Sequence, residues 1–160
     1  MKKFIISIDA GTTSNRSILF DLKGKPIFSS QKEFTQYFPK SGWVEHDPNE
    51  IWRTTIKTLK DVIQKAKKLK GEILSIGITN QRETTVLWDK KNGQPVYKAI
   101  VWQDRRQEEF CKKLRKQNKD TMIFNKTGLL IDSYFSGTKI KWILDNVPKA
   151  RQLMNKKQLL

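Results

Sequence analysis

Short apolar runs separated by turn residues occupy the beginning of the chain. The run Phe4–Ile8 is rich in β-branched residues and predicts a buried strand. A second apolar run follows at 17–20, and the residues 22–24 after it are typical of a turn. A third strand is expected from Pro26 to Phe34. The pattern therefore predicts three strands joined by tight connections.

A helical pattern replaces the strand pattern after the loop 35–46. Asp47 is expected as the N-cap, with Pro48 at the first helical position and Glu50 at the third. Gly71 is predicted at the position where a left-handed backbone ends the helix. The apolar face consists of Ile51, Thr55, Ile56, Leu59, Val62, Ile63 and Ala66. Lysines occupy the other face, so we expect a long amphipathic helix that covers a sheet.

The second half of the chain predicts shorter elements in an α/β order. Two of its helices have candidate N-caps, Asp104 for a helix from Arg105 to about Gln117 and Ser136 for one ending near Asn146. The other expected elements are strands at 73–79 and 84–88, a turn at 91–93, a short apolar segment at 99–102 and a helical segment at 150–160. We find no repeat, low-complexity linker or clear domain boundary.

The bend between the first two strands combines a carboxylate, a glycine, hydroxyl groups and an arginine. Gly11 lets the backbone approach an anion, and successive turn N–H groups can form an anion-binding concavity. The hydroxyls and Arg16 add donors and positive charge, and Asp9 can hold a hydrated Mg²⁺. The residues concerned are Asp9, Gly11, Thr12, Thr13, Ser14 and Arg16. An ordinary polar β-turn explains the same composition, and the Walker loop pattern is absent.

Composition restricts the class of protein. A chain of 160 residues, 37% hydrophobic and 30% charged, is long enough for one well-filled core or for one domain and part of another. The single Cys111 cannot form an internal disulfide, which fits a reducing compartment. No apolar stretch is long enough to cross a bilayer, so the cytoplasm is the expected location.

The net charge of +16 suggests two classes of explanation. One is a nucleic-acid or anionic-membrane surface, and the other is a lysine-rich surface without an assigned partner. Most basic residues are lysines scattered over predicted helices, and no zinc-ligand spacing or recognition helix is present. We therefore expect neither a nucleic-acid nor a membrane partner. A basic binding module stays as an alternative, and its DNA binding would weaken steeply with salt.

Five sequence blocks in a fixed order carry a resemblance to a known family. They are IDAGTTSNR at 8–16, GWVEHDPNEIW at 42–52, GITNQRETTVLWD at 77–89, IVWQDRR at 100–106 and FSGTKIKWILDNV at 135–147. In these blocks the chain resembles the FGGY family of carbohydrate kinases, which phosphorylate polyols and sugars, and within it the members that act on glycerol. The resemblance covers the whole chain.

The resemblance implies a fold and a set of site residues. The fold is a ribonuclease-H-like α/β domain of the actin, hexokinase and sugar-kinase superfamily, with a mixed β-sheet. Asp9 would lie near Mg²⁺ and the phosphates of ATP, which Gly11, Thr12, Thr13, Ser14 and Arg16 would contact. Arg82, Glu83, Trp102 and Tyr134 would form the glycerol site. The chain departs from the usual family pattern at Ala10 and Asn15, and we expect no loss of binding from Ala10.

The residue types of the implied glycerol site suit a small polyol. Arg82 donates hydrogen bonds and Glu83 accepts them, while Trp102 offers a flat apolar wall and Tyr134 a hydroxyl on an aromatic body. An ordinary structural role is the alternative for three of them: a surface ion pair for Arg82 and Glu83, and a core position for Trp102. For Tyr134 the sequence favours neither a structural nor a binding role. His46 is expected to shape a loop, and Cys111 to lie in the core.

The resemblance also implies that much of the enzyme lies outside these residues. The aspartate that accepts the proton of the attacking hydroxyl falls beyond residue 160 in the family pattern, as does the domain that clamps adenosine. We therefore expect residues 1–160 to be an incomplete N-terminal domain that is inactive by itself, from a homo-oligomeric parent. A kinase for another polyol or sugar, expected to differ at Asn80–Thr84, and an actin- or chaperone-like ATPase stay as alternatives.

Overall fold

The computed structural model describes residues 1–160, which divide into two compact units. Unit 1 consists of Met1–Gln36 and Asp47–Gln81, and unit 2 consists of Tyr37–His46 and Arg82–Leu160. Each unit takes two separate segments of the chain, which explains why no linker marks the division in the sequence. None of the helices is long and apolar enough to cross a membrane.

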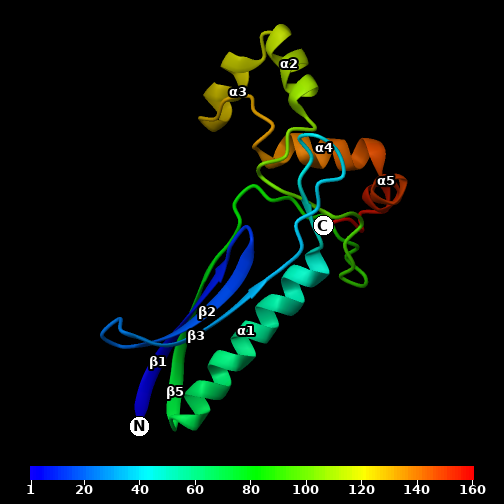
Figure 1. Cartoon of the computed structure of the whole chain (residues 1–160). Helices are drawn as coiled ribbons and strands as arrows, with labels where there is room; N and C mark the ends of the chain where they lie inside the picture. Colours follow the sequence, from blue (N-terminus) through cyan, green and yellow to red (C-terminus); the bar gives the residue numbers. More distant parts are fainter. The chain divides into compact units, whose positions relative to one another are not determined.

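Unit 1 contains a four-stranded mixed sheet with the strand order β3-β2-β1-β5. The strands are β1 (Lys2–Ala10), β2 (Ser14–Asp21), β3 (Pro26–Glu33) and β5 (Gly71–Thr79). The first three are connected as antiparallel neighbours, and β5 lies parallel to β1 after a crossover through the long helix α1 (Pro48–Lys68). Figure 1 shows α1 running along these strands. The expected strands and the mixed sheet are confirmed.

The core of unit 1 lies between the sheet and α1. Alternate side chains of β1, including Phe4, Ile6 and Ile8, are buried against Val62 and Ala66 of the helix. Asp47 caps the helix as predicted, since its carboxylate accepts a hydrogen bond of 2.9 Å from the N–H of Asn49. The predicted apolar face therefore contains the buried Val62 and Ala66, but it omits Thr58, which is also buried.

The end of α1 differs from the prediction. Lys70, with φ of 52°, takes the left-handed conformation, while Gly71 already belongs to β5. Gly71 serves another purpose, because a Cβ added there would lie 2.1 Å from Cε2 of the buried Phe4 ring. A close approach of backbone to ring, and not a positive φ, therefore requires the glycine.

Unit 2 is built from short elements. A small antiparallel pair joins β4 (Glu45–His46) to β6 (Ala99–Ile100). Its core includes the buried residues Ile100, Ile143 and Ala150. The helices are α2 (Glu108–Lys116), α3 (Asp120–Thr127), α4 (Ser136–Asn146) and α5 (Pro148–Asn155).

The strand expected at 84–88 does not form as a continuous element. Thr85 bridges Ile100 and Trp88 bridges Pro95, so successive residues pair with different partners and no ladder extends. The turn at 91–93 is confirmed, with Gly93 in the left-handed region at φ of 69°.

The helix starts in unit 2 also differ from the prediction. Asp104 is buried and lies before α2, whose N-cap is Gln107. Ser136 is the first residue of α4, and Phe135 precedes it as the N-cap. Helix α3 was not predicted, because it buries no side chain and so leaves no amphipathic pattern. Cys111 is buried in unit 2, as expected.

Candidate functional site

The bend between β1 and β2 is held by backbone hydrogen bonds. The N–H of Gly11 donates to the carbonyl oxygen of Ser14 at 3.0 Å, and a Cβ at Gly11 would lie 3.0 Å from that oxygen. The carbonyl of Thr12 accepts from Nε2 of Gln36 at 3.2 Å, and that of Thr13 accepts from the N–H of Phe34 at 3.3 Å. The bend is therefore tight and supported from the β3 side.

The structure brings three of the predicted phosphate-site residues onto one face of the sheet. Asp9 lies opposite Arg16 in the antiparallel register, and Ser14 is two residues from Arg16. Because strand side chains alternate, all three lie on the face opposite the buried Ile8, away from α1. Gln31 connects two of them, as its Nε2 donates to Ser14 Oγ and its Oε1 accepts from Arg16 Nε, both at 2.9 Å.

The alternate residues of β2 attach the bend to α1. Asn15 is fully buried, and its Nδ2 donates to the carbonyl of Ile51 at 2.9 Å and to Oγ1 of Thr54 at 2.7 Å. Ser17 and Thr58 share a buried hydrogen bond of 2.9 Å. Sequence reasoning missed these contacts, although two polar residues at core-facing positions of an alternating strand were the signal.

The carboxylate predicted to lie near Mg²⁺ does not belong to a cluster of metal-binding side chains. No group of three or more histidine, cysteine, aspartate or glutamate side chains could hold a metal ion. Asp9 is exposed at the end of β1. A single carboxylate fits the way Mg²⁺ is bound at phosphate sites, where water and the phosphates supply most of the six ligands.

In unit 2, Glu83 is held in a defined orientation. Its backbone lies in the left-handed region at φ of 63°, which is uncommon for a residue with a side chain. Oε2 of its carboxylate accepts two hydrogen bonds of 2.7 Å, from the N–H and from Oγ of Ser136. The exposed Arg82 makes no ion pair with it, so the surface ion pair considered as an alternative does not form.

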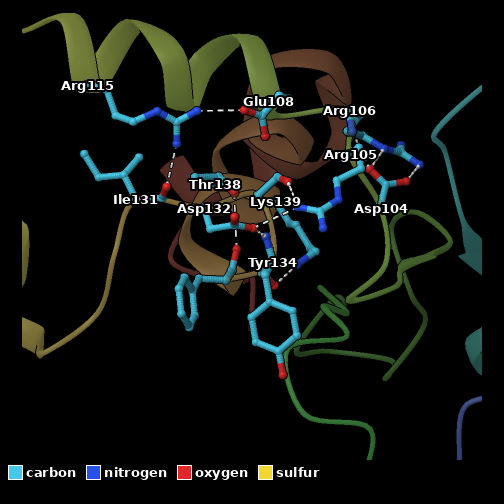
Figure 2. A network of polar contacts seen from close by, with 12 residues as sticks. Asp104, Arg105, Arg106, Glu108, Arg115, Ile131, Asp132, Tyr134, Thr138 and Lys139 are labelled. Carbon is cyan, nitrogen blue, oxygen red and sulfur yellow. Dashed lines mark hydrogen bonds and ion pairs between the residues drawn. The ribbon is translucent and has the colours of Figure 1, made fainter. Parts of the chain in front are cut away.

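The two aromatic residues of the predicted alcohol site contact one another. The ring centroids of Trp102 and Tyr134 are 6.0 Å apart in an edge-to-face arrangement. Trp102 is half-buried, which differs from the core position considered as its alternative. The N–H of Tyr134 donates to Oδ1 of Asp132 at 2.7 Å, and its carbonyl accepts from Nζ of Lys139. Figure 2 shows the Tyr134 ring pointing away from this network.

Lys139 is the largest fully buried side chain of the protein. Burial lowers the pKa of its ammonium group from 10.5 to about 8, against the opposing effect of the carboxylates of Glu83, Asp104 and Asp132. Arg105, the remaining charge close to it, lowers the pKa further. Sequence reasoning missed this residue, because a lysine in a lysine-rich helix gives no sign of burial.

A second buried charge stabilises the loop before α2. The guanidinium carbon of Arg106 lies 3.8 Å from the ring centroid of Trp43 and 4.5 Å from that of Trp142. Its Nη2 donates at 2.8 Å to both Asp104 and Glu45. Burial alone would lower the pKa of Arg106, but these hydrogen bonds outweigh it and raise the pKa. His46, beside Glu45 in β4, is also buried.

The predicted site residues thus fall into two groups within separate units. The phosphate-site residues belong to unit 1, and the alcohol-site residues belong to unit 2. Within unit 2, residues from the loop after β5, the segment after β6 and the start of α4 are linked by the contacts of Glu83, Trp102 and Tyr134. The arrangement offers one anchored carboxylate, one exposed guanidinium and two aromatic surfaces.

Comparison with known proteins adds independent findings. Residues 4–159 match the model of the N-terminal domain of the FGGY family of carbohydrate kinases. The chain is 61% identical over 151 residues to a glycerol kinase of Oceanobacillus iheyensis, covering 94% of this chain and 30% of that protein. It is 58% identical over 159 residues to a glycerol kinase of Malacoplasma penetrans, covering 99% of this chain and 31% of that protein.

A solved structure agrees with these relatives. The crystal structure of Plasmodium falciparum glycerol kinase with ADP matches with a TM-score of 0.93 and 35% sequence identity, over 99% of this chain and 32% of that chain. The chain therefore spans about a third of the length of the proteins it matches. The family match over nearly every residue and the shared sugar-kinase fold show that this chain belongs to the FGGY family of carbohydrate kinases.

Proposed function

We propose that the protein to which this chain belongs transfers the γ-phosphoryl group of ATP to glycerol, forming sn-glycerol 3-phosphate. The observation that carries the proposal is the cluster of Glu83, Trp102 and Tyr134 within unit 2. The identities of 61% and 58% to glycerol kinases support the choice of glycerol over other polyols and sugars.

The chemistry of the cluster suits a triol. Each glycerol hydroxyl can donate and accept a hydrogen bond, so a site with a fixed acceptor and a flexible donor can bond adjacent hydroxyls. Ser136 holds Glu83 through Oε2, so Oε1 is the oxygen that would meet a glycerol hydroxyl, and Arg82 is exposed. Trp102 would cover the carbon backbone, and the Tyr134 hydroxyl would contact one end. A site of this kind disfavours analogues that leave its polar groups unpaired.

Unit 1 would supply the phosphate contacts. Asp9, Ser14 and Arg16 share one sheet face, while the N–H groups and hydroxyls of residues 11–13 surround the bend. We propose that these groups bind the phosphates of ATP or ADP, and that Asp9 lies near Mg²⁺. The similar glycerol kinase of Plasmodium falciparum was crystallised with ADP, which supports nucleotide use. The ion, when bound, neutralises charge on the phosphates.

The remaining parts of the proposal concern the whole protein. We propose that residues 1–160 form part of an N-terminal domain, and that the catalytic base and the adenosine-clamping domain belong to the portion of the relatives that the chain does not match. A homo-oligomeric state, a cytoplasmic location and the lack of nucleic-acid or membrane partners stay predictions. The isolated chain is expected to show no ATP turnover with glycerol.

Ligand titration of the chain tests the proposal. The indole N–H signal of Trp102, assigned with Trp102→Phe, is followed by NMR during additions of glycerol and, separately, of a five-carbon sugar. Glycerol is expected to shift this signal, and the Glu83→Gln and Arg82→Ala variants are expected to lose the shift. A stronger response to the sugar would favour a kinase for another substrate, and the absence of any response to glycerol would contradict the proposal.

A further inference from the structure

The first turn of α4 contacts two residues of the proposed alcohol site. Ser136, its first residue, holds the carboxylate of Glu83, and Lys139, one turn later, holds the carbonyl of Tyr134. Because Ser136 and Lys139 are three residues apart on one helix, they lie on the same face. Glu83 and Tyr134 are therefore held by one rigid element.

The contact with Glu83 uses the helix terminus. The first N–H groups of a helix have no partner within the helix and carry partial positive charge. No side chain within α4 caps these groups, and Oε2 of Glu83 takes this role from 53 residues away in sequence. Because both hydrogen bonds from Ser136 go to Oε2, the other oxygen, Oε1, is the one that a ligand hydroxyl would meet.

The contact with Tyr134 fixes its backbone from both sides. Asp132 accepts from its N–H, and Lys139 donates to its carbonyl. Figure 2 shows the Lys139 side chain reaching the carbonyl, and Nζ of Lys139 also lies 5.9 Å from the centroid of the Tyr134 ring. The ring also contacts Trp102 and Phe135, at centroid distances of 6.0 and 5.2 Å. The direction of the Tyr134 hydroxyl thus depends on a backbone that Lys139 and Asp132 hold.

The burial of Lys139 costs free energy, because it removes a charged group from water, and this cost points to a specific role for the lysine. Only 1% of the residue is exposed, and no carboxylate lies close enough for an ion pair. A methionine of similar length would fill the same space without the cost of removing a charge from water. Its ammonium group donates to the Tyr134 carbonyl, which ties the buried charge to the position of that residue.

We propose that Ser136 and Lys139 are positioning residues, which orient Glu83 and Tyr134 for a small alcohol without contacting it. The inference rests on the proposed function for the identity of the alcohol. Loss of either residue would leave all four predicted ligand-binding residues in the sequence but would misplace one of them, Glu83 for Ser136 and Tyr134 for Lys139. Misplacement of this kind lowers binding even where no contact is deleted.

The main test compares two lysine variants of α4. Lys139→Met removes the buried ammonium, and Lys141→Met is the matched control, because Lys141 is exposed and its ion pair is with Asp145 on the same helix. Glycerol affinity, read from the Trp102 indole signal, is expected to fall roughly tenfold in Lys139→Met and to stay unchanged in Lys141→Met. Equal affinities in both variants would overturn the inference.

A pH series separates positioning from simple packing. The charged groups that face Lys139 are Glu83, Asp104, Asp132 and Arg105, and the thiol of Cys111 on α2 is also close enough to interact with it. Glycerol affinity of the wild-type chain is expected to decline as the pH rises through about 8, where Lys139 loses its proton. Lys139→Met is expected to show no such decline, and a parallel decline in both proteins would contradict the inference.

A serine series covers the case in which Lys139→Met fails to fold. Ser136→Ala removes the hydroxyl but keeps the N–H that bonds Glu83, and Ser136→Thr restores a hydroxyl. Affinity for glycerol is expected to fall severalfold in the first and to recover in the second. A full effect of Ser136→Ala without recovery in Ser136→Thr would show that the hydroxyl is not the group that positions Glu83.

A ligand-free measurement distinguishes failure of this inference from failure of the proposed function. Nuclear Overhauser contacts between the rings of Trp102 and Tyr134, assigned with Trp102→Phe and Tyr134→Phe, are expected in the wild-type chain and should weaken in Lys139→Met. If they weaken while glycerol does not bind the wild-type chain, the positioning role stands and the proposed substrate is wrong. If they are unchanged in the variant, the positioning role of Lys139 is wrong, whether or not glycerol binds.

Discussion

Units 1 and 2 hold their predicted site residues by different means. In unit 1 the bend at residues 11–13 is shaped by backbone hydrogen bonds and by attachment of β2 to α1. In unit 2 the site residues are held by side chains, Glu83 by Ser136 and Tyr134 by the buried Lys139, and the buried Arg106 stabilises the loop before α2. A site built on backbone geometry tolerates side-chain changes around it, whereas a site built on buried charges depends on each partner.

The largest expected effect is the loss of the buried guanidinium in unit 2. Arg106→Met leaves the carboxylates of Asp104 and Glu45 buried without their cation, and should lower the free energy of unfolding by about 3–5 kcal/mol. Arg151→Met is the control, since its ion pair with Asp145 is exposed, and should cost less than about 1 kcal/mol. Urea unfolding measures both. Similar small losses would show that unit 2 does not depend on buried charge.

The next effect is a pH dependence of stability that arises from Lys139. Burial lowers its pKa to about 8 in the folded chain from an ordinary 10.5, so the unfolded chain binds more protons between these pH values. The free energy of unfolding should therefore rise with pH across this window, by up to about 3 kcal/mol relative to Lys139→Met. Urea unfolding of both proteins at several pH values from 7 to 10.5 measures the difference. A difference that falls with pH would refute the assignment.

A smaller effect is expected from one glycine of unit 1. Gly71→Ala places a methyl group against the buried Phe4 ring and should lower stability by about 1–3 kcal/mol. Gly77→Ala on the same strand is the control, because a Cβ there meets nothing within 4 Å. Hydrogen exchange of β1 and β5 amides locates the change within unit 1. Equal stability of the two variants would show that the ring moves aside without cost.

The smallest expected effect concerns the cap of α1. Asp47→Ala removes the acceptor of the Asn49 N–H and should lower stability by about 1 kcal/mol, while Asp47→Ser should retain most of the cap. Thermal unfolding followed by circular dichroism measures both variants. If Asp47→Ala destabilises α1 but leaves the bend of residues 11–13 unchanged, the bend does not depend on the start of the helix.

The sequence predictions were more accurate for unit 1 than for unit 2. In unit 1, β1, β2, β3 and the body of α1 were all predicted; β1, β2 and α1 each bury one face and so carry a regular pattern, whereas β3 was predicted although none of its residues is fully buried. In unit 2, the expected strand at 84–88 and the cap at Asp104 were wrong. Asp104 has the sequence signature of an N-cap, but its carboxylate accepts from the N–H of Val44, 60 residues earlier in the chain, and from the N–H and guanidinium of Arg106, and α2 begins only at Glu108.

The sequence alone determined the class of fold, the strand–bend–strand element with residue types that suit a phosphate group, and the family resemblance. These depend on local periodicity and on residue types that stand side by side in the chain. Only the tertiary structure decided that Ser136 orients Glu83, that Lys139 is buried beside Tyr134, and that Gly71 packs against Phe4. Each of these contacts joins residues that are brought together only when the chain folds. The burial of a single lysine does not change the hydrophobic periodicity of the residues around it, so the sequence does not reveal it.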